Sequence, residues 1–281
     1  MRAKPRDIDP RRPASARPSY PALPPNHIPR RFARMARSYM SWSPAMQIFR
    51  PAAERGHVRA GWLDSRHSFS FGHYHDPQWM GWGPLRVINE DRVQPGAGFA
   101  PHGHANMEII SYVISGGLAH RDSAGNEGVL RPGELQWMSA GHGIEHSEYN
   151  ASDSEPVHFL QIWIQPDRLN AAPDYAQKAF DPAARRARWG LLASPDGADG
   201  SLAIRQDARL LGVQLAAGES VARNLDPTRR YWLQVVQGQV SVGERVLSAG
   251  DAIGHADEAG ELRIAGTGET LADLLLFDLP A

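Results

Sequence analysis

Two histidine-containing motifs in one half of the chain are the residues best suited to do chemistry. They are Pro101-His-Gly-His-Ala-Asn-Met-Glu108 and Gly141-His-Gly-Ile-Glu-His-Ser-Glu148. On a β-strand, side chains two residues apart leave the same face, so His102 and His104 point together, and so do His146 and Glu148. Two such strands facing one cavity would supply three imidazoles and one carboxylate. That donor set suits a divalent transition metal whose remaining coordination positions stay open to water or substrate.

The metal interpretation competes with a simpler one, in which these histidines are ordinary core or surface residues. A single His-x-His pair is weak evidence, because histidine has many roles. The i, i+2 spacing recurs behind a glycine-rich turn, however, and three neutral imidazoles with one anion would form a costly desolvated cluster without a cation. We therefore predict a metal site formed by His102, His104, His146 and a glutamate.

Spacing alone leaves the identity of that glutamate open. Glu108 lies an even number of residues after His104, but four residues of extended strand span about 13 Å. A bulge or turn would be needed to bring Glu108 back to the histidines. Glu108 and Glu148 are therefore both candidate ligands on the pattern alone.

The composition removes several common functional classes. The 281 residues include no cysteine, which excludes disulfides, thiolate metal sites and cysteine nucleophiles. The lysines are Lys4 and Lys178, so Schiff-base chemistry has almost no candidates. The formal net charge of −1 argues against direct binding of nucleic acid. The longest apolar runs are far shorter than the roughly 20 residues of a membrane helix, so we predict no membrane insertion.

Charge and proline content set the start of the chain apart from the rest. Residues 1–46 hold ten of the 30 Lys and Arg residues, two aspartates, and nine of the 22 prolines. Such a segment buries too little apolar area to order itself, so we predict a disordered basic tail over residues 1–45. We expect two domains to follow, over residues 46–167 and 185–281, joined by a connecting segment over residues 168–184.

The rest of the sequence predicts an all-β architecture of sandwiches or barrels. Short β-branched and aromatic runs are broken by Gly, Pro, Asn and Asp, and the run His158 to Gln165 is apolar on both faces. A run that ends at Gly116 is echoed by one that ends at Gly238, an offset of about 120 residues, which indicates a duplicated unit. Around Ala176 to Arg188, helical periodicity predicts a short helix between the halves.

Several segments together resemble the pirin family of the cupin superfamily. The first histidine motif, with its preceding glycine and following glutamate, is similar to the first cupin motif. The more specific similarity lies in Gly56-His-Val-Arg-Ala-Gly-Trp-Leu-Asp-Ser-Arg-His-Ser-Phe-Ser-Phe71, Leu85-Arg-Val-Ile-Asn89, Met138-Ser-Ala-Gly-His-Gly-Ile-Glu-His-Ser-Glu-Tyr-Asn150 and Gln161-Ile-Trp-Ile-Gln-Pro166. The resemblance covers residues 46–281 and implies a bicupin, with two β-barrel or jelly-roll domains packed together. It is strongest to bacterial pirin-like quercetin 2,3-dioxygenases.

The resemblance also implies a site and a reaction. Pirins take their ligand glutamate from the second motif, which selects Glu148 over Glu108. The implied cofactor is one divalent transition metal, with iron expected first and nickel, copper, manganese, cobalt or zinc as alternatives. The implied reaction is the opening of a flavonol such as quercetin by O2 with release of carbon monoxide, in which Glu148 would also act as general base. The alternative is a non-enzymatic metal-binding pirin that regulates a protein partner. In both cases we expect a cytoplasmic protein.

The second half of the sequence departs from the metal pattern. Aligned by its glycines, it places Asn224 and Asp226 near the positions of the two histidines, so we predict a C-terminal cupin domain without a metal site. In the first half, His142 is a candidate to orient a ligand imidazole, whereas His120 and His158 are interpreted as strand residues with satisfied hydrogen bonds. The candidate pocket walls are Trp137, Trp163, Phe99 and Phe71.

Overall fold

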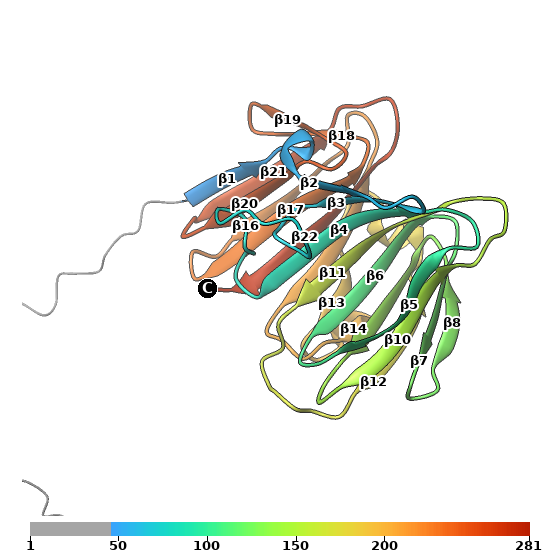
Figure 1. The fold of residues 1–281 in the computed structure, drawn as a ribbon. Helices are drawn as coiled ribbons and strands as arrows, with labels where there is room; N and C mark the ends of the chain where they lie inside the picture. Colours follow the sequence, from blue (N-terminus) through green and yellow to red (C-terminus); the bar gives the residue numbers. More distant parts are fainter. Residues whose placement is uncertain (1–45) are drawn as a thin grey trace, which may run out of the picture. The chain divides into compact units, whose positions relative to one another are not determined.

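The computed structural model describes residues 46–281, which form two β-barrels, each built from a seven-stranded and a four-stranded sheet (Figure 1). The first barrel contains the two histidine motifs. Its large sheet has, in spatial order, β12 (Asp174–Ala179), β9 (Glu134–Ser139), β6 (Glu108–Ser115), β11 (Val157–Ile164), β4 (Leu85–Val93), β3 (Leu63–His67) and β2 (Gly56–Arg59). Its small sheet has the order β5 (Gly98–His104), β10 (Ile144–Asn150), β7 (Leu118–Asp122) and β8 (Glu127–Leu130).

The second barrel repeats this arrangement. Its large sheet has the order β1 (Met46–Arg50), β20 (Ala252–Ala256), β17 (Arg229–Gln237), β22 (Ala272–Pro280), β15 (Arg209–Leu215), β13 (Gly190–Ser194) and β14 (Leu202–Ala203). Its small sheet has the order β16 (Ser220–Leu225), β21 (Gly260–Gly266), β18 (Gln239–Val242) and β19 (Arg245–Ser248). Short 3-10 helices occur at Ala52–Glu54, Pro182–Arg185 and Ala198–Gly200. The all-β bicupin prediction is confirmed.

Strand β11 shows why its sequence is apolar on both faces. Leu160 and Ile162 belong to the core cluster that lies between the two large sheets, together with Trp232 and Phe277 of the second barrel. Phe159, one residue out of phase, packs inside the first barrel instead. Successive side chains of a strand point to opposite faces, so a strand that lies between two apolar cores has apolar residues at consecutive positions.

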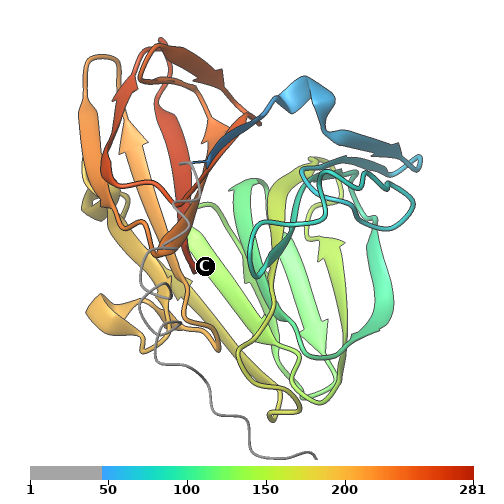
Figure 2. The ribbon, with the colours of Figure 1, turned by 90° about the vertical axis from the view of Figure 1, so that its left-hand side faces the viewer.

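Each barrel includes an edge strand from outside its own continuous stretch of sequence. Strand β1 pairs with β20 of the second barrel, and the chain then crosses to the first barrel, where β2 pairs with β3 (Figure 2). Conversely, β12 comes from the connecting segment and pairs with β9 of the first barrel. Each large sheet therefore has an edge strand from beyond the domain boundaries expected from the sequence, and those boundaries stay a prediction.

The expected helix around Ala176 to Arg188 is wrong. Asp174–Ala179 is strand β12, and the helical part is the single 3-10 turn Pro182–Arg185, whose N-cap Asp181 accepts a hydrogen bond from the Ala183 backbone. The open edge of β9 offers the segment a full ladder of backbone hydrogen bonds, which outweighs a weak local preference for helix. Within residues 46–281, none of the helices has the length and apolar character needed to cross a membrane. The predicted disordered tail lies outside the described residues.

Matching hydrogen-bond ladders support the duplication seen in the sequence. Gly116 and Gly238 both follow a central strand and both adopt positive φ, +81° and +75°, which glycine tolerates best. With these glycines matched, the pair Ser111 and Gln161 of the first barrel corresponds to the pair Leu233 and Leu276 of the second. The ladders also share a register shift at the same place in both barrels.

Candidate metal centre

The candidate ligands come from two adjacent strands of the first barrel's small sheet. In the antiparallel pair formed by β5 and β10, His102 lies directly opposite His146, and His104 lies opposite Ile144. Along β10 the burial alternates, with His146 and Glu148 buried and the residues between and beside them more exposed. The period-two argument from the sequence thus brings His102, His104 and His146 to one face.

The three imidazoles form a compact triangle. Their ring centroids are 4.8 Å apart for His102 and His104, 4.5 Å for His102 and His146, and 4.9 Å for His104 and His146. One ring nitrogen from each histidine lies within 4.8 Å of the other two. His146 is buried, whereas His102 and His104 are only partly so, which leaves the group open toward solvent on the side of β5.

The hydrogen bonds around these rings fit a metal ion. His102 Nδ1 lies 2.8 Å from the Ala100 carbonyl oxygen, which can only accept, so His102 carries its proton on Nδ1 and has a bare Nε2. The Nε2 atoms of His104 and His146 are buried and have no hydrogen-bond partner among the described residues. Buried imidazole nitrogens without partners are costly unless a cation fills the space between them. The residues present therefore fit a divalent metal.

Burial also keeps the candidate ligands in the protonation state that metal binding needs. Loss of solvent, with a contribution from His102, lowers the pKa of His104 to about 4. Loss of solvent and the neighbouring histidines lower the pKa of His146 to about 2. Both rings are therefore neutral at pH 7, with lone pairs available for coordination.

Glu148 lies beside the triangle rather than within it. Its carboxylate is grouped with His146 and His120, with ligand atoms within 4.8 Å of one another. One oxygen accepts a hydrogen bond of 2.8 Å from Gln161 Nε2 and the other one of 3.2 Å from Ser111 Oγ. Burial raises the pKa of Glu148 to about 7, against the opposing effect of these two hydrogen bonds. His146 is the residue common to both groups.

Glu108 is placed away from both groups. It is fully buried, and it accepts hydrogen bonds from Trp137 Nε1 at 2.8 Å, from the Ser139 hydroxyl, and from the Arg205 backbone N–H at 3.0 Å. Glu108 lies on β6, after the turn that ends β5, so the alternation of side-chain faces along β5 does not continue to it. Its side chain leaves β6 on the same face as Ile110, toward the core between the barrels. Ser111, on the opposite face of β6, is the residue that reaches Glu148.

Aromatic side chains border the histidine triangle. Trp163 meets the His104 ring edge-on at 4.8 Å, and Phe71 in turn meets Trp163 at 5.2 Å. Phe99 lies 6.4 Å from the His102 ring. Of the aromatic residues considered from the sequence, Trp137 is elsewhere, in the core between the barrels with Glu108.

Sequence reasoning missed the histidine that contacts a candidate ligand. His142 is exposed, whereas His120 is buried on β7 with its Nδ1 3.4 Å from His146 Nδ1. The ladder between β10 and β7 places His120 directly opposite Glu148. No local motif marks His120, because its position depends on which strand pairs with β10. His158 is the satisfied strand residue expected, 2.9 Å from Glu90.

The second barrel has different residues at the corresponding positions. Its small-sheet ladders place Arg223, Leu225, Leu262, Ile264 and Val242 where the first barrel has His102, His104, His146, Glu148 and His120. The alignment of Asn224 with a ligand histidine is therefore wrong by one residue. Asn224 is exposed, because a shift of one position along a strand moves a side chain to the other face.

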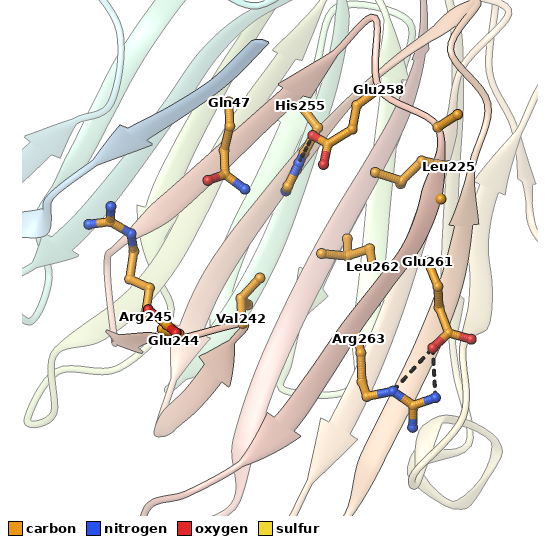
Figure 3. A pocket seen from close by; sticks show the side chains of 13 residues that line it. Gln47, Leu225, Val242, Glu244, Arg245, His255, Glu258, Glu261, Leu262 and Arg263 are labelled. Atoms are coloured by element: carbon orange, nitrogen blue, oxygen red, sulfur yellow. Dashed lines mark hydrogen bonds and ion pairs between the residues drawn. The ribbon is translucent and has the colours of Figure 1, made fainter. Parts of the chain in front are cut away.

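A cavity of about 460 Å³ remains at this place in the second barrel (Figure 3). Leu225, Val242 and Leu262 form its apolar part. The buried imidazole of His255 contacts Glu258 at its edge, with 2.7 Å between Nδ1 and the carboxylate.

Comparison with known proteins identifies the family. The model of the pirin family matches residues 48–164, and that of the quercetinase C-terminal cupin domain matches residues 191–279. A quercetin 2,3-dioxygenase from Escherichia coli is 43% identical over 235 residues, covering 84% of this chain and 99% of the relative. The chain belongs to the pirin family. This confirms the resemblance seen in the sequence.

Other pirins support the same assignment. A pirin-like protein from Caulobacter vibrioides is 43% identical over 212 residues, which cover 75% of this chain and 90% of that protein. The crystal structure of the bacterial pirin YhhW from Escherichia coli in complex with nickel(II) is 42% identical and superposes with a TM-score of 0.78, covering 84% of this chain and 99% of that one.

Proposed function

We propose that this pirin is a metal-dependent dioxygenase that opens the ring of a flavonol such as quercetin, with O2 as second substrate and carbon monoxide as a product. The observation that carries the proposal is the triangle of His102, His104 and His146, in which the buried Nε2 atoms of His104 and His146 have no partner among the described residues. Relatives named quercetin 2,3-dioxygenase at 43% identity support the substrate class.

His102, His104 and His146 would hold one divalent metal, with Glu148 as the fourth protein ligand. The nickel complex of a related pirin supports a metal of this class. The resemblance favours iron and the nickel complex favours nickel, so both metals are to be tested. When bound, the metal would act as a Lewis acid on the flavonol 3-hydroxyl oxygen and raise the electron density of the ring for attack on O2.

Glu148 would accept the proton of the flavonol 3-hydroxyl. Burial raises the pKa of Glu148 to about 7 in the metal-free site, so a carboxylate held only loosely by the metal would be basic enough to take a proton and release it near neutral pH. Gln161 and Ser111 donate to its two oxygens and so hold the carboxylate beside His146. Trp163 and Phe71 would exclude water from the side of His104, which protects the activated substrate from competing reactions.

The test is an aerobic and anaerobic flavonol assay on nickel-loaded and iron-loaded protein. We expect quercetin absorbance to fall only when metal and O2 are both present, with carbon monoxide released in proportion to quercetin consumed. Loss of absorbance without O2, or in metal-free protein, would contradict the dioxygenase proposal. A protein that binds metal but leaves quercetin and related flavonols unchanged would favour the regulatory alternative. The protein partner of that alternative and the cytoplasmic location stay predictions.

A further inference from the structure

Beyond the ligands themselves, a second histidine lies behind His146. His120 Nδ1 is 3.4 Å from His146 Nδ1, and His120 Nε2 is 3.3 Å from a carboxylate oxygen of Asp122. Both distances are at the long end of the hydrogen-bond range. The three side chains come from two paired strands, since Asp122 and His120 on β7 lie opposite His146 and Glu148 on β10.

Asp122 determines the direction of this chain of hydrogen bonds. Its carboxylate already accepts from the backbone N–H of Ala124 and of Asn126, both at 3.0 Å, and from the Asn126 side chain at 2.9 Å. A carboxylate surrounded by donors acts as an acceptor, so His120 donates from Nε2. A neutral imidazole that carries its proton on Nε2 has a bare Nδ1.

The bare Nδ1 of His120 can only accept the Nδ1 proton of His146. His146 is then held in the tautomer that leaves Nε2 without a proton, and this Nε2 is the buried atom without a partner near His102 and His104. His120 is itself held in place, because its ring stacks on Tyr175 of β12 with centroids 5.0 Å apart and an angle of 25°. The orientation of the His120 ring is therefore fixed by three contacts, with Asp122, His146 and Tyr175.

We propose that Asp122 and His120 are positioning residues that fix the tautomer of His146 for metal binding. Groups of this kind, which bond to the second nitrogen of a ligand histidine, typically change metal affinity about 10- to 100-fold when removed. The inference rests on the proposed metal site, but it is independent of the substrate.

The test measures nickel(II) affinity by competition with a chelator for the wild-type protein and three variants. His120→Phe keeps a ring to stack on Tyr175 but removes the acceptor, so we expect about 10- to 100-fold weaker binding. His120→Asn restores an oxygen acceptor near the Nδ1 position, and we expect binding within about threefold of wild type. Asp122→Asn presents an N–H to His120 Nε2 and reverses the tautomers, so we expect weakened binding as for His120→Phe.

The matched control is His57→Phe, which disrupts the exposed pair of His57 and Asp64, 3.0 Å apart on β2 and β3, and should leave affinity unchanged. Thermal unfolding of each metal-free variant checks folding. Wild-type affinity in His120→Phe, or equal losses in His120→Phe and His120→Asn, would overturn the positioning role.

A spectroscopic measurement separates positioning from direct ligation. In the cobalt(II)-loaded protein, His120→Asn should keep the ligand-field spectrum of wild type. A change in coordination number would assign His120 as a ligand instead and overturn the proposal. A wild-type protein that binds neither nickel nor cobalt would refute the metal site itself, and with it the proposed function. Normal metal affinity without flavonol turnover would refute only the function.

Discussion

The two barrels have the same strand order and nearly the same ladders, yet their interiors differ in kind. One continuous apolar cluster fills the second barrel, including Leu233 and Leu276. At the matching positions the first barrel has Ser111 and Gln161, whose hydrogen bonds to Glu148 interrupt its apolar interior and leave two smaller clusters. The same backbone arrangement therefore supports either an apolar core or a polar site, and the types of the inward-facing residues determine which one forms.

The buried polar side chains inside the first barrel form hydrogen bonds with one another. Glu148 accepts hydrogen bonds from Gln161 and Ser111, and Asp91 accepts one from the Ser65 hydroxyl. Buried polar groups are costly without a partner, and a metal would remove that cost for the Nε2 atoms of His104 and His146.

The strongest test makes the first barrel resemble the second. His146→Leu copies Leu262, the residue at the corresponding position, and removes the ligand shared by both groups. We expect metal content below about a tenth of wild type, because the remaining histidines do not complete a site. Metal analysis of purified protein checks this. The matched control is Leu262→Ala, which should lower stability and leave metal content near wild type.

The second test separates the two glutamates. Glu148→Gln removes the proposed base, so we expect turnover per bound metal to fall about 10²- to 10⁴-fold. Glu108→Gln should instead cost about 1–3 kcal/mol of stability, because an amide N–H then faces donors such as Trp137 Nε1, while turnover per metal is kept. Kinetics and thermal unfolding of both variants give the comparison. The opposite pattern would place the ligand and base at Glu108.

A third test uses the matched positions Leu233 and Ser111. Leu233 is fully buried in the apolar cluster, so Leu233→Ala should cost about 2–5 kcal/mol in the free energy of unfolding without changing metal affinity. Ser111→Ala removes the hydroxyl that bonds Glu148 and the Gln161 side-chain oxygen, so it should cost about 1–2 kcal/mol in stability and raise the pKa of Glu148. Denaturant titration and the pH profile of turnover measure the two effects. Equal losses of stability in Leu233→Ala and Ser111→Ala would refute the claim that the second barrel has an apolar core where the first has a polar site.

The last test concerns the pH dependence of stability that Asp91 gives to the first barrel. Burial raises the pKa of Asp91 to about 7, whereas in the unfolded chain it is near 4. The folded state therefore holds a proton that the unfolded state releases, so this contribution is complete at low pH and is lost as pH rises from about 4 to 7. Asp91→Asn should flatten the pH dependence by an amount on the order of 3 kcal/mol in the free energy of unfolding. Unfolding of metal-free protein across this range checks it, and identical profiles for variant and wild type would contradict it.

Much of the site could be predicted from the sequence because its signal is local. The i, i+2 spacing determines that His102 and His104 share one strand face, and likewise His146 and Glu148, whatever the rest of the chain does. The all-β class, the duplication and the apolar character of both faces of β11 are also written in short stretches of sequence, and the structure agrees with each.

Only the tertiary structure decided how strands far apart in the sequence align. It turned Glu108 toward the core between the barrels, placed His120 behind His146, moved β1 into the second barrel and put Leu225 rather than Asn224 on the inner face. Each outcome depends on the register between strands, and a shift of one residue reverses which face a side chain occupies. Register is set by long-range pairing and burial. A local pattern therefore determines which side chains share a face of one strand, but not which side chains of other strands they contact.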